Sequence, residues 1–151
     1  MRILARNLLF PALILAAADA AAGEAVHPVP MPKEHIAGAI FTERKPVVLR
    51  HRSETGEYST EDVEVFRNED GKFDAGMYRS GPVRATIGEP YGVNEFMYFL
   101  EGGVTLTSAD GHVLKVNAGD AVVIPRNWTG VWDTTGYTKI YVIYSPDKPI
   151  E

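Results

Sequence analysis

The chain has 151 residues, of which 45% are hydrophobic and 23% are charged, so it can bury a core and lacks the composition of a disordered chain. It contains no cysteine, which excludes disulfides, thiolate catalysis and zinc sites built on cysteine. The net charge is −5 and the chain has no block of Lys or Arg, which argues against nucleic acid or an anionic membrane as a partner.

The first 22 residues have the pattern of a secretory signal peptide. Arg2 and Arg6 give a positive start, an apolar run follows from Leu8 to Ala18, and small residues surround a cleavage point at Ala18-Asp19-Ala20. The apolar run is about half as long as the ~20 residues that a membrane-spanning helix needs. We therefore expect a secreted protein, periplasmic if the source is a Gram-negative bacterium, with no membrane association after removal of the signal.

From Pro46 onward, short apolar runs alternate with turn sequences such as Asp110-Gly111, a pattern typical of an all-β sandwich or barrel. Residues 23–45 are predicted to form an extended lead-in to this part, and the polar stretch Ser53–Ser59 is predicted to be a surface loop. The apolar runs predict strands at Val47–Arg50, Asp62–Arg67, Lys72–Arg79, Val83–Ile87, Glu95–Leu100, Val104–Thr107, His112–Val116, Ala121–Ile124, Thr129–Trp132 and Lys139–Tyr144.

Two segments resemble the signature motifs of cupins. Gly119-Asp120-Ala121-Val122-Val123-Ile124-Pro125 is similar to the second motif, and Glu95-Phe96-Met97-Tyr98-Phe99-Leu100-Glu101-Gly102 is similar to the end of the first. One departure is Asn127, which stands where the family motif has a glycine. The resemblance, from about Val65 to Tyr144, is to the subfamily that includes ureidoglycine aminohydrolase-like proteins and the ethanolamine-utilisation cupin. It implies a single cupin domain, a jelly-roll β-barrel over residues 46–151.

The resemblance also indicates where the usual cupin metal would bind, and this chain lacks most of the ligands. Cupins have two His and one Glu on the first motif and a third His on the second. Here Glu95 keeps the carboxylate, whereas Glu89, Tyr91 and Gly130 occupy the His positions. We therefore expect no cofactor, with a divalent metal at Glu95 as the alternative. The histidines that are present are predicted to lie at the surface: His27, His35, His51 and His112.

In place of a metal, aromatic and apolar side chains are expected around the Glu95 carboxylate in the barrel interior. The predicted ligand-binding residues are Glu95, Tyr91, Met97, Phe99, Trp132, Glu89 and Lys139. A buried carboxylate without a partner is costly, and its candidate partners are Lys139, Arg84, Tyr78 and Tyr91. The sequence leaves open whether these side chains fill the interior or line a pocket.

Three functions remain, in our order of preference. The first is an exported, metal-free cupin that binds a small molecule in its barrel, with simple acid/base activity as an option and Glu95 as the candidate catalytic residue. The second is a non-catalytic interaction or scaffold protein that forms a homodimer through its edge strands. The third is a metal-dependent enzyme similar to ureidoglycine aminohydrolase, against which the missing His residues count directly.

Cleavage of the signal is expected to leave a mature N-terminus at Ala21 or Gly23, because both follow small residues behind a short apolar run. Mass spectrometry of the protein purified from its native host measures this directly. An intact Met1 would contradict the assignment of a signal peptide.

Overall fold

A computed structural model describes residues 26–150 of the chain. The predicted signal peptide and its cleavage point lie outside the described residues. Within residues 26–150, no helix is long and apolar enough to cross a membrane. The elements are η1 (His35–Ala39), α1 (Ile40–Glu43), β1 (Val47–Ser53), β2 (Gly56–Arg67), β3 (Phe73–Ser80), β4 (Val83–Ile87), β5 (Asn94–Ser108), β6 (Val113–Asn117), β7 (Ala121–Ile124), β8 (Gly130–Thr134) and β9 (Tyr137–Tyr144).

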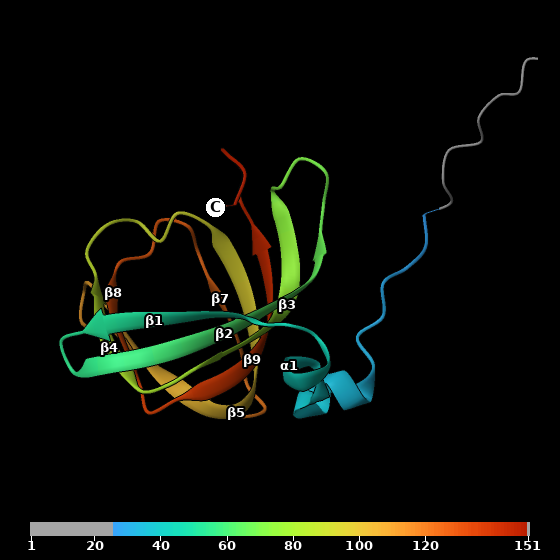
Figure 1. Cartoon of the computed structure of the whole chain (residues 1–151). Helices are drawn as coiled ribbons and strands as arrows, with labels where there is room; N and C mark the ends of the chain where they lie inside the picture. Colours follow the sequence, from blue (N-terminus) through green and yellow to red (C-terminus); the bar gives the residue numbers. More distant parts are fainter. Residues whose placement is uncertain (1–25, 151) are drawn as a thin grey trace, which may run out of the picture.

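The strands wrap into a jelly-roll β-barrel in which paired strands are antiparallel, as the sequence predicts (Figure 1). The hydrogen-bonded order is β1-β2-β3-β9-β5-β8-β4, and β6 and β7 each pair with β5. Strand β5 joins the two walls of the barrel. Its first part pairs with β9 and β7, and its last part pairs with β6 and β8.

The continuity of β5 is the largest difference from the sequence prediction. The sequence predicts separate strands at Glu95–Leu100 and Val104–Thr107 with a turn between them, whereas β5 includes both segments. Gly102 has a φ of 65°, and an added Cβ there would clash with the carbonyl oxygen of Gly136. The register with β9 also shifts near this point. The glycine and the bulge therefore bend the strand and do not reverse its direction.

The predicted loop over Ser53–Ser59 is a tight hairpin between β1 and β2, in which Ser53 pairs directly with Gly56. The Ser53 hydroxyl accepts from the Thr55 amide at 3.2 Å and donates to the Gly56 carbonyl at 3.1 Å. These bonds stabilise the turn locally, so a polar sequence without apolar alternation still continues both strands.

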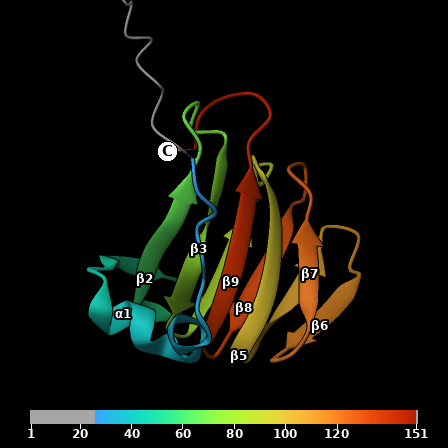
Figure 2. The same cartoon turned by 90° about the vertical axis from the view of Figure 1, so that its right-hand side faces the viewer.

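The predicted extended lead-in over residues 23–45 is wrong for its second half, because η1 and α1 follow residues 26–32. Ile40 and Phe41 of α1 are buried against Val63 and Met77 on the outer face of the barrel wall. Figure 2 shows α1 beside β2 and β3 and the preceding segment running along the sheet. Covering this apolar outer face explains why a four-residue helix forms here with so little intrinsic stability.

Strand alternation gives the barrel wall two different faces. Along β5, Glu95, Met97 and Phe99 are buried in the interior, whereas Phe96 and Tyr98 are exposed on the outside. Along β9, the inward positions include Lys139. The interior core consists of Val83, Met97, Phe99, Val104, Leu106, Val116, Ile124, Trp132 and Tyr137. Glu95 and Lys139 are therefore charged residues inside a largely apolar barrel.

Gly76 on β3 lies opposite Tyr141 on β9, where a larger residue would not fit. An added Cβ would clash with the Val63 carbonyl oxygen and lie 2.7 Å from the Tyr141 hydroxyl oxygen. We expect Gly76→Ala to lower the free energy of unfolding by about 1–3 kcal/mol, the usual effect of overpacking. Gly88→Ala is the control, because a Cβ there meets nothing within 4 Å. Equal stability of the two variants in urea unfolding would contradict the close contact at Gly76.

Candidate functional site

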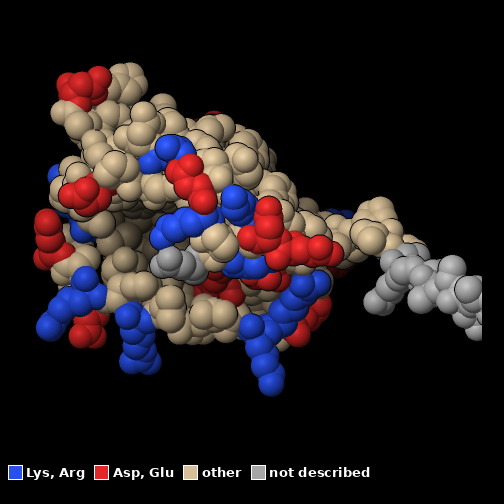
Figure 3. Space-filling view, turned by 90° about the horizontal axis from the view of Figure 1, so that it is seen from above, with Lys and Arg blue, Asp and Glu red and all other residues tan. Residues whose placement is uncertain are grey.

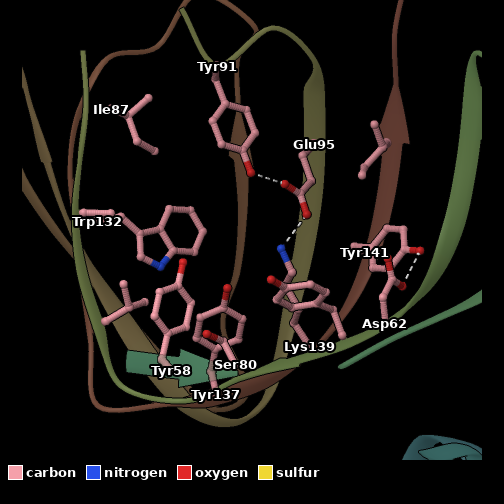
Figure 4. A pocket seen from close by; sticks show the side chains of 14 residues that line it. Tyr58, Asp62, Ser80, Ile87, Tyr91, Glu95, Trp132, Tyr137, Lys139 and Tyr141 are labelled. Atoms are coloured by element: carbon pink, nitrogen blue, oxygen red, sulfur yellow. Dashed lines mark hydrogen bonds and ion pairs between the residues drawn. The ribbon is translucent and has the colours of Figure 1, made fainter. Parts of the chain in front are cut away.

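The barrel interior contains a cavity of about 310 Å³ (Figure 4). Seen from above, this end of the molecule is hollowed, with basic and acidic side chains interspersed around it (Figure 3). The interior is therefore partly open, which the sequence could not decide. Its aromatic lining consists of Tyr58, Tyr78, Tyr91, Trp132, Tyr137 and Tyr141. Its polar lining consists of Asp62, Ser80, Glu95 and Lys139.

A buried ion pair between Glu95 and Lys139 lies at one wall of the cavity. Glu95 Oε1 is 2.5 Å from Lys139 Nζ, and the two residues are 3% and 5% exposed. They come from the neighbouring strands β5 and β9, whose register places Phe99 opposite Lys139. The long Lys139 side chain therefore reaches along the strands to Glu95. Because an unpaired buried charge is strongly destabilising, each partner requires the other.

Tyr91 completes the environment of the Glu95 carboxylate. Its hydroxyl donates to Glu95 Oε2 at 2.5 Å, so each carboxylate oxygen has a donor. Burial, reinforced by the negative charge of Glu95, raises the pKa of Tyr91 well above its ordinary value, which keeps the phenol protonated as a donor. The Tyr91 amide donates to the Trp128 carbonyl at 3.0 Å, and this bond fixes the loop before β5.

Aromatic rings surround the Lys139 ammonium on the cavity side. Nζ lies 5.2 Å from the ring centroid of Tyr78 and 5.7 Å from those of Trp132 and Tyr137, distances at which cation–π attraction operates. Nζ also donates to Met97 Sδ at 3.1 Å. An ammonium has three N–H donors, so one remains for a molecule in the cavity once Glu95 and Met97 are bound.

A second buried polar group links Asp62 and Asp74 through Tyr141. The Tyr141 hydroxyl donates to Asp62 Oδ1 at 2.9 Å and lies 3.5 Å from Asp74 Oδ1. Burial raises the pKa of Asp62, and burial raises the pKa of Asp74 to about 6. Asp62 lines the cavity, whereas Asp74 lies behind it with its Oδ2 2.8 Å from the Arg67 guanidinium.

Four of the predicted ligand-binding residues line the cavity: Glu95, Tyr91, Trp132 and Lys139. The other three require correction. Met97 and Phe99 are fully buried and belong to the packed core, where Phe99 lies 5.3 Å from the Tyr137 ring. Glu89 is exposed and does not line the cavity, because the chain leaves the barrel wall after β4.

Two of the four candidate partners of Glu95, Lys139 and Tyr91, contact it directly. Arg84 instead pairs with Asp133 at the surface, and Tyr78 contacts the pair only through its ring. Tyr58, Asp62 and Tyr141 also line the cavity, although the sequence did not predict them as site residues. Aspartate is uncommon in strands, and both Asp62 and Asp74 lie in predicted strands. This was the one feature of the sequence that could have indicated a polar group in the barrel wall.

The residues at the family's metal position do not fit a metal ion. Among residues 26–150, no group of three or more His, Cys, Asp or Glu side chains is arranged to hold one. Glu95 is occupied by Lys139, and Glu89 lies outside the cavity. At Gly130, a Cβ would lie 2.8 Å from Cζ2 of the Trp128 indole, so that ring lies beside the position of the third His.

Comparison with known proteins places the barrel among cupins. Residues 67–141 match the model of the EutQ-like cupin domain. A protein of unknown function from Pseudomonas syringae pv. tomato has a similar structure, with a TM-score of 0.58 and 22% identity over 66% of this chain and 45% of that one. The Clostridium difficile EutQ protein is similar with a TM-score of 0.50 and 18% identity, over 60% of this chain and 65% of that one.

This chain therefore spans less than two thirds of the length of either protein. The search of curated proteins found no match. At these identities the structural likeness shows the fold, and the domain match agrees with it. The chain therefore has the fold of a cupin barrel, with a match to the EutQ-like domain model over residues 67–141.

Proposed function

We propose that this protein, once exported and freed of residues 1–22, binds a small organic molecule in its barrel cavity without a metal ion. The observation that carries the proposal is the open cavity beside the buried Lys139–Glu95 pair. A packed core does not need a charged pair for its stability. An ion pair beside an open cavity offers a bound molecule polar contacts, and the cavity walls offer it a complementary surface.

The cavity dimensions and lining favour a compact molecule that contains a ring. Its volume of about 310 Å³ is ample for a ring, since an apolar cavity of about 150 Å³ holds benzene. Its aromatic walls offer stacking surfaces. Its acids, Glu95 and Asp62, outnumber its base, Lys139, so a cationic or hydrogen-donating group is favoured over an anion.

Simple acid/base activity belongs to the same proposal. Glu95 is the candidate that the sequence indicates, and the hydroxyl of Tyr91 and the ammonium of Lys139 lie within hydrogen-bond distance of it. General acid/base catalysis requires such groups within direct reach of the reacting atom. A molecule in the cavity would lie beside these polar groups, because all three residues line it.

A non-catalytic homodimeric scaffold is the second candidate, and one feature of the barrel surface favours it. Phe96, Tyr98, Val123 and Tyr144 are exposed apolar residues on the outer face of β5, β7 and β9. The register pairs Phe96 with Val123, so these side chains are neighbours. Exposed apolar patches of this kind often mark association surfaces. For the third candidate, a metal-dependent enzyme, the described part of the chain offers no group of three His, Cys, Asp or Glu side chains that could hold the metal.

Thermal unfolding with benzamidine, benzamide and benzoate tests the binding proposal, because the three probes share a size and differ in charge. We expect benzamidine, and more weakly benzamide, to raise the melting temperature by a few degrees, whereas benzoate has no effect. A probe at a hundredfold excess over its Kd stabilises by about 2.7 kcal/mol. A chelator should not change the shifts, because no metal takes part.

The matched variants are Ala85→Leu and Thr86→Leu, neighbours on β4. Ala85 lines the cavity, whereas Thr86 is exposed on the outside. The shift should disappear in Ala85→Leu, which fills the cavity, and persist in Thr86→Leu. Equal shifts in both variants, or no shift with any probe on the wild type, would argue against binding in the barrel.

A further inference from the structure

With the cavity as the proposed binding site, we infer that Asp62 is its proton-exchanging residue and that Asp62, Tyr141 and Asp74 hold and deliver one shared proton. The three residues come from β2, β9 and β3, so the group depends on strands that lie far apart in the sequence. Figure 4 shows Tyr141 and Asp62 bonded to one another at the cavity wall, apart from Tyr91 and Glu95.

Glu95 is poorly suited to exchange a proton with a bound molecule, although the sequence favours it. Both of its oxygens already accept bonds of 2.5 Å, one from Lys139 and one from Tyr91. Adding a proton to Glu95 would break one of these bonds and leave the Lys139 ammonium buried without its counter-charge. Asp62 also lines the cavity, and its carboxyl bonds to a neutral hydroxyl instead of an ammonium.

The position of the Tyr141 hydroxyl between two carboxyls implies a shared proton. Its oxygen lies 2.9 Å from Asp62 Oδ1 and 3.5 Å from Asp74 Oδ1. Burial and the nearby carboxylates raise the pKa of Tyr141 far above its ordinary value, so the hydroxyl keeps its hydrogen. One hydroxyl can donate to only one acceptor at a time. The second carboxyl is therefore favoured in its protonated form, donating to the Tyr141 oxygen.

The charged neighbours make the two ends of this group different. Arg67 lies 2.8 Å from Asp74 Oδ2 and favours an ionised Asp74, whereas Glu64 opposes ionisation there. Lys139 favours an ionised Asp62, and Glu64 again opposes it. Burial raises the pKa of both carboxyls, that of Asp74 to about 6. Two interacting carboxyls of this kind keep a proton to a higher pH than an isolated aspartate does, and their titrations belong to the pair.

Delivery of the proton needs no other group. Starting with the proton on Asp74, the Asp74 carboxyl gives its proton to the Tyr141 oxygen as the Tyr141 hydroxyl proton passes to Asp62. Asp74 becomes a carboxylate facing the Arg67 guanidinium, and Asp62 becomes a carboxylic acid in the cavity. Asp62 then donates that proton to a basic atom of the bound molecule. Each O–H bond that breaks is matched by one that forms, and the reverse sequence removes a proton from the molecule.

Carbon-13 NMR of aspartate-labelled protein, titrated from pH 3 to 8 without any ligand, tests this inference. The Asp62 and Asp74 carboxyl signals are assigned with Asp62→Asn and Asp74→Asn. We expect both signals to follow the same two steps, with midpoints above the ordinary aspartate value of about 3.9. In Tyr141→Phe, which removes the shared hydroxyl, each carboxyl should titrate in a single step.

Tyr144→Phe is the control for that variant, since Tyr144 lies on the same strand with its side chain exposed, and it should keep the two shared steps. Independent single steps near pH 4 in the wild type would overturn the inference, even if no variant folds. Shared steps that persist in Tyr141→Phe would overturn it as well. Because no ligand is present, this failure is distinguishable from a failure of the binding proposal, which the probe-induced melting shifts measure.

Discussion

The buried ion pair between Lys139 and Glu95 is the interaction on which the interior of this barrel depends. Moving either charge out of water costs several kcal/mol, and only a partner at hydrogen-bond distance offsets that cost. The pair joins β5 to β9, holds the Tyr91 hydroxyl at Glu95, and places the ammonium among the rings of Tyr78, Trp132 and Tyr137. These groups are the wall of the cavity.

The pair also explains how a cupin barrel can remain ordered without the residues of the usual metal site. A metal ion would draw ligands from both motifs to one point in the interior. Here Glu95 keeps its inward position, but its counter-charge comes from Lys139 on β9. Asp62 and its partner Tyr141 also line the cavity, and two differently arranged carboxyls, Glu95 and Asp62, therefore face it. Such differences between neighbouring acids are how protein sites separate binding from proton transfer.

Much of the fold could be predicted, because short strands with turns of Gly and Asp leave a local signal. The predicted bounds of β4 and β7 are those observed. The errors have physical causes. A glycine pair usually marks a turn. In β5, however, Gly102 allows the strand to bend where the Gly136 backbone lies too close for a side chain. The helix α1 has too few apolar residues to show a period and is stabilised by Val63 and Met77, which are distant in sequence.

Only the part of the site around Glu95 could be predicted, because only that part follows from the spacing of the cupin motifs. That spacing gave the inward direction of Glu95, and the cost of burying a carboxylate indicated Lys139 and Tyr91 as partners. Strand alternation also indicates that Met97 and Phe99 point into the barrel. It does not indicate whether an inward side chain lines the cavity or packs in the core, and both belong to the core. The approach of Asp62 to Tyr141 follows from the register of β2, β3 and β9, including a bulge after Glu64, which no local pattern specifies.

A double-mutant cycle across the ion pair tests the central claim most directly. Urea unfolding of Glu95→Gln, Lys139→Met and the double variant measures how far the two residues depend on one another. Each single change should cost about 3–5 kcal/mol, because it leaves one buried charge unpaired. The double variant should cost at least about 2 kcal/mol less than the sum of the two. Additive losses, equal to that sum within about 0.5 kcal/mol, would show that the two charges act independently and would contradict this account.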